Sequence, residues 1–220
     1  MSAGTRSREA EIVRDLVAEH GETFAHEAGI PLKDTPQPLY RLLVLAVLLS
    51  ARIRGSVAVA AARELSEAGL RDPRSMAAAD WQRRVDALGR GGYRRYDERT
   101  ATQLGEGAEL VQERWGGDLR RLHREAGGDV AALRDLLQEV PGLGPAGADI
   151  FLREAQAVWT DIAPYLDTKA LSGAERLGLP EDPERLASVA GDTDPAALAA
   201  ALVRAALDKK VAEKVAESVG

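Results

Sequence analysis

The chain has 220 residues, of which 45% are hydrophobic and 29% are charged, and its formal net charge is −6. This length can bury a substantial core in one domain or in two closely packed lobes. The acidic charge argues against a generic nucleic-acid coat protein but leaves room for a local basic face, and the lack of cysteine excludes disulfides and cysteine-ligated zinc or iron–sulfur sites.

The first third of the chain predicts helices around one buried helix. A surface helix is expected from Glu9 to His20, and residues 29–38 contain three prolines and predict an irregular connector. From Leu39 to Ala51 the sequence is apolar nearly all round, which predicts burial on every side and a central place in a helical lobe. An alanine-rich helix is expected from Ser56 to Ala68.

A basic stretch follows a capped helix. Asp80 is placed as the N-cap of a helix from Trp81 to Leu88, with Gly89 as its C-terminal stop. The residues from Arg90 to Tyr96 combine glycines, arginines and tyrosines, and the stretch from Trp81 to Arg99 holds six arginines against three acids. This composition is typical of a loop that touches phosphates and stacks on bases. The alternative is a solvated loop.

The rest of the chain also predicts helices, and no segment has the alternating pattern of a strand. A helix is expected from Thr100 to Trp115, and Asp118 and Asp129 are placed as the N-caps of the next two. The later helices are expected over 146–157, 183–190 and 195–219, with a linker over 180–183 and the last helix packing back on the bundle. The predicted segments are 1–37 (N-terminal helix and connector), 38–140 (central lobe), 141–180 (hairpin and aspartate segment) and 181–220 (C-terminal helices).

The stretch from Leu136 to Ile150 predicts a helix, a tight turn and a second helix. Pro141 cannot continue the first helix, because it lacks an N–H and clashes with the preceding turn. Gly142 and Gly144 tolerate unusual backbone angles and leave the turn uncovered, and Pro145 suits the first turn of the next helix. The free N–H groups would then favour an anion such as phosphate. The alternative is a plain helix–helix turn.

These residues resemble the helix-hairpin-helix of the endonuclease III-like DNA glycosylases, in the HhH-GPD superfamily. The hairpin resemblance lies in the sequence from Val140 to Gly144, followed by a helix of small residues. Other segments similar to the family occur in the same order, within about residues 38 to 180: Leu45–Ala51, Leu88-Gly89, Tyr96–Arg99, Trp159–Ala163, Leu166–Thr168 and Glu175–Leu179.

The resemblance implies an all-α, two-lobed fold with an active-site cleft between the lobes. It implies base excision repair of double-stranded DNA, in which a damaged or mispaired base is flipped out and its N-glycosidic bond is hydrolysed. The DNA-binding residues that it implies are Gly142, Leu143, Gly144, Ala146 and Arg52. To these we add Arg94 and Tyr96 from the basic stretch and Lys169, which comes just after Asp167. It also allows a monovalent cation, Na⁺ or K⁺, on the backbone carbonyls of Gln138, Val140 and Leu143.

The chain departs from the family in two ways. It cannot hold the four-cysteine iron–sulfur cluster that many members carry, and the position of the family's lyase lysine holds Ala146. Without that amine, Schiff-base chemistry by the usual route is excluded, so the resemblance implies a monofunctional glycosylase. Arg52 stands where some members insert a glutamine into the gap left by the extruded base. Its planar head can stack there or simply solvate a helix end.

The catalytic residue implied by the resemblance is Asp167. Its carboxylate would stabilise positive charge on the sugar as the base leaves, or orient an attacking water. The same residue is also a good N-cap for the following helix, and the two roles are compatible. Lys169 is a candidate phosphate ligand. The alternative function is a non-catalytic relative that binds DNA or a protein partner.

No side-chain metal site or membrane partner is expected. The three histidines, His20, His26 and His123, show no metal-ligand spacing with carboxylates and are interpreted as surface or cap residues. Residues 1–8 lack the apolar core of a signal sequence, and the longest apolar run, from Leu42 to Leu49, is too short to cross a bilayer. We expect a cytoplasmic protein, nucleoid-associated if bacterial, and nothing implies an oligomer.

Overall fold

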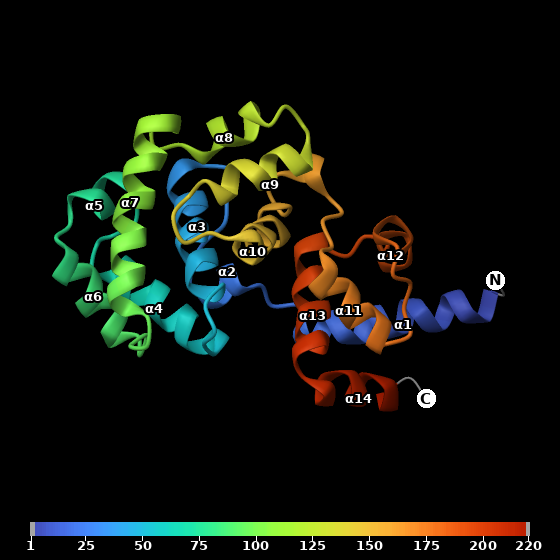
Figure 1. The fold of residues 1–220 in the computed structure, drawn as a ribbon. Helices are drawn as coiled ribbons and strands as arrows, with labels where there is room; N and C mark the ends of the chain where they lie inside the picture. The colour runs from blue at the N-terminus through green and yellow to red at the C-terminus, as the bar shows by residue number, and fades with distance from the viewer. Residues whose placement is uncertain (1–2, 219–220) are drawn as a thin grey trace. The chain divides into compact units, whose positions relative to one another are not determined.

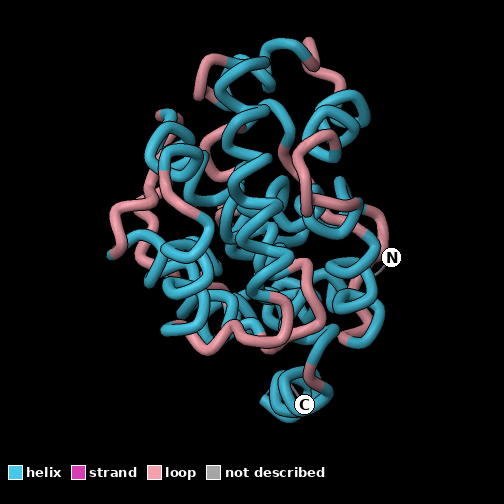
Figure 2. Tube along the Cα trace, turned by 60° about the vertical axis from the view of Figure 1, so that its left-hand side comes forward, coloured by secondary structure: helices cyan, strands magenta, loops and turns pink. Residues whose placement is uncertain are grey.

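A computed structural model describes residues 3–218, and the predicted all-α class is confirmed: no strand occurs in those residues (Figures 1 and 2). The elements, in chain order, are α1 (Ala3–His20), α2 (Phe24–Glu27), α3 (Pro36–Leu49), α4 (Gly55–Glu67), α5 (Pro73–Ala78), α6 (Trp81–Arg90), α7 (Asp97–Trp115), α8 (Leu119–Glu125), α9 (Val130–Gln138), α10 (Pro145–Ala155), the 3-10 helix η1 (Thr160–Ile162), α11 (Thr168–Arg176), α12 (Pro183–Ala190), α13 (Pro195–Leu207) and α14 (Lys209–Ser218).

The chain forms two compact units. The first, Ala25–Leu152, contains α3 to α9 and most of α10, and we name it the hairpin unit. The second joins the residues up to Phe24 with those from Arg153 onward, and we name it the terminal unit. These units group the chain differently from the four predicted segments. In particular, α1 packs with the C-terminal helices, because its apolar face lies in their core.

Helix α3 lies at the centre of the hairpin unit, as its composition predicts. Nine of its side chains are buried, and α4 and α8 pack against it. The helix spans Pro36–Leu49, so it begins inside the predicted connector, where Pro36 occupies a first turn that needs no N–H. The predicted stop of α6 at Gly89 is wrong. The helix continues to Arg90, and the left-handed glycine that turns the chain is Gly92, with φ +82°.

Helix α13 is the core of the terminal unit, with α11 packed tightly on it. Gly173 of α11 allows this approach, because a Cβ there would lie 1.9 Å from the carbonyl oxygen of Leu202. The single helix predicted over 195–219 is in fact two, α13 and α14. The break is at Asp208, whose backbone is extended and whose side chain accepts from the N–H of Lys210 at 2.9 Å. The predicted end at Val219 lies outside the described residues.

Within residues 3–218, no single helix is long and apolar enough to span a membrane. The bent pair α12 and α13 reaches the required length and composition only when the two helices are taken together, and they meet at 109°.

Candidate nucleic-acid interface

The glycine-containing turn joins α9 to α10 in the geometry that its sequence predicts. Pro141 and Gly142 occupy the two central positions, Gly142 has φ +84°, and the N–H of Leu143 donates to the carbonyl of Val140 at 3.0 Å. This is the pattern of a type II turn, which needs a positive φ at its third residue and therefore glycine. Helix α10 then begins at Pro145, as expected for a proline in a first turn.

The two helices of the hairpin are tied together. Asp129 caps α9 as predicted, with its carboxylate 2.8 Å from the N–H of Ala131. Arg134 of α9 donates to both carboxylate oxygens of Asp149 of α10, at 2.6 and 3.2 Å. Leu143, between the helices, is buried. The turn therefore has little freedom to change shape.

A charged network fixes the end of α9 to α7 and α8. Arg114 forms ion pairs with Glu139 and with Glu125, and the second oxygen of Glu125 accepts from the indole N–H of Trp115 at 2.7 Å. The hydrogen bond from Trp115, followed by that from Arg114, lowers the pKa of Glu125. The network thus holds a carboxylate in its ionised form beside the hairpin.

The turn presents unused hydrogen-bond donors. Among residues 3–218, no acceptor receives the N–H groups of Gly142, Gly144, Ala146 or Gly147. Gly144 and Ala146 are exposed, and a Cβ built on Gly144 would have nothing within 4 Å. Because Gly144 is also not in the left-handed region, nothing in the fold requires glycine at this position. A bare backbone at a helix N-terminus is the arrangement that binds phosphate.

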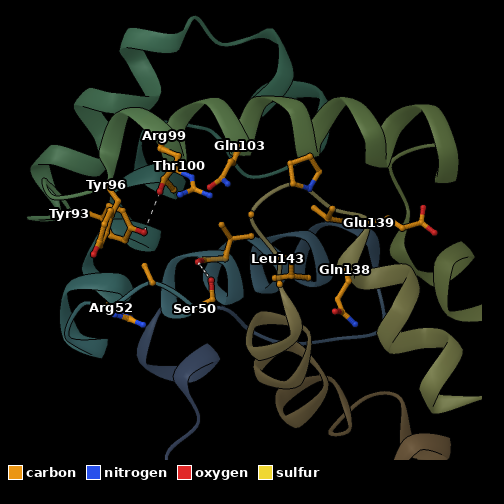
Figure 3. Close-up of a pocket in the computed structure, with 16 residues that line it drawn as sticks. Ser50, Arg52, Tyr93, Tyr96, Arg99, Thr100, Gln103, Gln138, Glu139 and Leu143 are labelled. Carbon is orange, nitrogen blue, oxygen red and sulfur yellow. Dashed lines mark hydrogen bonds between the residues drawn. The ribbon is translucent and has the colours of Figure 1, made fainter.

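The turn forms one wall of a hollow with a volume of about 660 Å³ (Figure 3). The end of α3, the loop before α7, and α7 itself form the rest. The predicted residues that line it are Arg52, Tyr96, Gln138, Val140, Gly142, Leu143 and Gly144. Sequence reasoning did not single out Arg99 and Gln103, which also line the hollow. The excess of arginine over residues 81–99 is the sequence signal that could have identified Arg99.

Two tyrosines take different places beside this hollow. Tyr93 is buried and receives a hydrogen bond from the hydroxyl of Thr100 at 3.3 Å (Figure 3). Burial raises the pKa of Tyr93, so its ring is a neutral part of the wall. Tyr96 is only half-buried, and the guanidinium of Arg95 lies 5.2 Å from its ring centre. Tyr96 is therefore the aromatic ring available for stacking.

Arg94 does not line the hairpin hollow. It lies in a neighbouring recess of about 490 Å³ together with Arg52, Arg54 and Arg95. All four side chains are exposed, and none forms an ion pair with a carboxylate in the described part of the chain. Arg52 lines both hollows, so the predicted basic stretch and the hairpin share one surface.

Asp167 is held by two partners within the terminal unit. It is the N-cap of α11, accepting from the N–H of Ala170 at 3.2 Å, as its sequence position predicts. Both of its oxygens also accept from Nη1 of Arg153, at 2.9 and 2.8 Å, and both side chains are only 10% exposed. Sequence reasoning missed Arg153, because a pair between residues fourteen apart has no periodic signal. Lys169, in the first turn of α11, is exposed.

A buried glutamine fixes the loop before Asp167. The side chain of Gln156 is 0% exposed, donates to the carbonyls of Tyr165 and Pro195, and accepts from the N–H of Tyr165 at 2.7 Å. These bonds satisfy backbone groups that would otherwise be buried without partners. The position of Asp167 is therefore set on one side by this loop and on the other by α11.

No protein-family model and no curated protein matches the chain. It is similar to a solved structure of endonuclease III trapped as a covalent intermediate with DNA, in an estranged-adenine complex. The match has 19% sequence identity, covers 73% of this chain and 70% of that chain, and has a TM-score of 0.46.

Proposed function

We propose that the protein binds double-stranded DNA through the hairpin unit and is a DNA glycosylase that hydrolyses the N-glycosidic bond of a damaged or mispaired base. The observation that carries the proposal is the pairing of two features on one surface. These are the free amides of the turn at Gly144 and the exposed, unpaired arginines that line the same hollow. Neutral amides and guanidinium groups are the usual phosphate ligands of DNA-binding proteins.

Each part of the surface has a role in this proposal. The amides of Gly142, Gly144 and Ala146 receive a backbone phosphate at the start of α10. Arg52 and Tyr96 offer planar groups to the unstacked duplex, since guanidinium and aromatic faces both stack on bases. The target nucleotide is flipped out of the duplex, as chemistry on a base requires.

The chemistry would rest on Asp167. An ionised carboxylate stabilises positive charge on the sugar as the base departs and can orient the attacking water. Arg153 holds that carboxylate in one orientation through both oxygens. Ala146 offers no amine at the start of α10, so a Schiff base by the family's usual route does not form, and strand cleavage would require later treatment.

The donor set of the turn fits a monovalent cation such as Na⁺ or K⁺. The carbonyls of Gln138 and Leu143 accept no hydrogen bond within residues 3–218, and that of Val140 accepts only one. Carbonyl oxygens at the end of α9 carry partial negative charge and are hard ligands. When bound, the cation would supply positive charge beside the DNA phosphate.

A single-turnover assay tests the proposal. The duplexes would carry uracil, an oxidised pyrimidine, 8-oxoguanine opposite adenine, hypoxanthine, an alkylated purine or an abasic site, each incubated with wild type or Asp167→Asn. We expect strand breaks on one base-lesion duplex only after hot alkali, and none with the variant. Breaks without alkali would contradict the monofunctional assignment. The variant must keep the wild-type circular dichroism spectrum for the comparison to count.

A second candidate is a non-catalytic DNA-binding relative. The observation that favours it is the Arg153–Asp167 pair itself, because a carboxylate with both oxygens engaged is less available to water or sugar. This candidate predicts salt-sensitive duplex binding without product on any lesion. Loss of duplex binding as well would contradict both candidates.

A further inference from the structure

Helix α4 begins without a cap. Its N-cap residue is Arg54, whose backbone is extended and whose side chain makes no cap hydrogen bond. The N–H groups of Gly55 and Ser56 find no acceptor in the described part of the chain. A helix N-terminus carries partial positive charge and is normally capped by Asp, Asn, Ser or Thr. Here an arginine adds a full positive charge where the fold alone would favour a negative one.

Three further arginines surround this helix start. Arg52, Arg94 and Arg95 line the same recess as Arg54, and they come from two loops separated by α4 to α6. Four like charges therefore line one recess of about 490 Å³. No acidic residue lines the recess. No carboxylate in the lining of the recess therefore offsets these positive charges, and none of the four arginines has an ion pair in the described part of the chain.

Two other arginines of the hairpin unit are paired with acids. Arg120 pairs with Asp118 through both oxygens, and Arg134 pairs with Asp149 in the same way. The recess arginines make no such bond, and the protein carries a net charge of −6, so acids are not scarce. Folding thus gives no reason for the cluster, whereas an anion bound at the start of α4 would.

We infer that the recess at the start of α4 is a second phosphate site, separate from the hairpin turn, and that it holds a phosphate group of the DNA backbone. The choice of DNA as the source of the phosphate rests on the proposed function. Guanidinium forks bind phosphate oxygens in pairs, and the free amides of Gly55 and Ser56 add neutral donors. Because Arg52 lines both hollows, DNA held by the hairpin also reaches this recess.

The first test replaces Arg54 with the cap that the helix lacks. Arg54→Asp should raise Tm by about 2 to 4 °C, because it caps α4 and removes repulsion. The same variant should bind a 20-base-pair duplex more weakly than wild type and should lose the rise in Tm that pyrophosphate gives to wild type. Since stability and binding change in opposite directions, misfolding cannot produce this result. Unchanged DNA affinity in Arg54→Asp would overturn the proposal.

The second test uses the salt dependence of binding to estimate how many DNA phosphates the protein contacts. The logarithm of the binding constant falls with the logarithm of salt by about 0.9 per phosphate contact in duplex DNA. Arg54→Gln and Arg94→Gln should each lower that slope by about one. The fold-loss of affinity between 50 and 200 mM NaCl should then be roughly threefold smaller in each variant than in wild type. Arg74→Gln is the matched control, because Arg74 is also exposed in the hairpin unit but lines neither hollow. Equal slopes in all three variants would overturn the DNA assignment.

The outcomes separate this inference from the proposed function. If pyrophosphate stabilises wild type but not Arg54→Asp while the DNA slopes stay equal, the recess binds a free phosphate compound and the DNA source is wrong. If the Gly144→Ala variant of the hairpin binds DNA normally while Arg54→Gln lowers the slope, the proposed hairpin contact fails and the recess contact stands. Absence of glycosylase activity leaves both binding measurements unaffected.

Discussion

Replacing either of two glycines of the hairpin turn by alanine should have opposite effects on the stability of the protein. Gly142 has φ +84°, and an added Cβ would lie 3.0 Å from Oε1 of Gln103 and 3.2 Å from Val47. Left-handed backbone costs alanine about 1–2 kcal/mol, and the crowding adds to this cost. We therefore expect Gly142→Ala to lose about 2 kcal/mol of stability, which corresponds to a fall of roughly 4 to 8 °C in Tm.

Gly144→Ala should instead keep or gain stability. Its φ is not in the left-handed region, and nothing lies within 4 Å of the added methyl group. Reduced freedom of the unfolded chain then favours the variant by about 0.4–1 kcal/mol. The methyl group would, however, stand over the amides that we assign to the phosphate. Loss of one amide bond to a charged ligand costs about 1.5–3 kcal/mol, which is a roughly 10- to 100-fold weaker complex.

The assay is fluorescence anisotropy of a labelled duplex at low salt, with Tm measured on the same samples. Gly89→Ala is the control, because Gly89 of α6 also has no atom near an added Cβ and lines neither hollow. The control should gain stability without losing affinity. If Gly144→Ala binds DNA within twofold of wild type, the turn is not a phosphate site and the argument from its open backbone fails.

Three further predictions concern stability. Arg153→Met leaves the carboxylate of Asp167 buried without its partner, so we expect a loss of about 3 kcal/mol, or roughly 6 to 12 °C in Tm, partly restored by adding Asp167→Asn. Gln156→Leu removes four hydrogen bonds from a fully buried site and should lower the free energy of unfolding, measured in urea, by at least ~2 kcal/mol. The lowered pKa of Glu125 stabilises the fold above the usual value of 4.5, and this stabilisation is lost as pH falls through the lowered pKa. Between pH 5 and pH 3, the Tm of Glu125→Gln should therefore fall by less than the Tm of wild type. An equal fall would contradict the assignment of this pH-dependent stability to Glu125.

Local signals in the sequence were sufficient for many elements. The turn at Pro141-Gly142 and the aspartate caps, such as Asp80 and Asp129, follow from the backbone chemistry of single residues, and the structure confirms them. The predicted helix stop at Gly89 is wrong, because glycine can either end a helix or lie within one. The helix tolerates Gly89 and ends near Gly92, since Gly92 adopts a positive φ and Gly89 does not.

Other features depend on contacts between distant residues. The packing of α1 with the C-terminal helices needs the core formed by Val13, Leu16 and α13, which no local pattern reveals. The pair of Arg153 with Asp167 is equally invisible in a sequence. The break at Asp208 does have a local signal, since aspartate is a good N-cap. The continuous apolar pattern around it concealed that signal.

The distribution of charge is compatible with the DNA-binding face that we propose for this acidic protein. A net charge of −6 describes the whole chain, whereas association with DNA depends on the charges within about one Debye length of the phosphates. In the hairpin unit, Arg52 and Arg99 line the hollow of the turn, and Arg54 and Arg94 line the recess at the start of α4. Two helix N-termini, those of α4 and α10, add partial positive charge at the same surface. Replacing two exposed acids elsewhere with glutamine should therefore change the salt slope of DNA binding far less than removing one of these arginines.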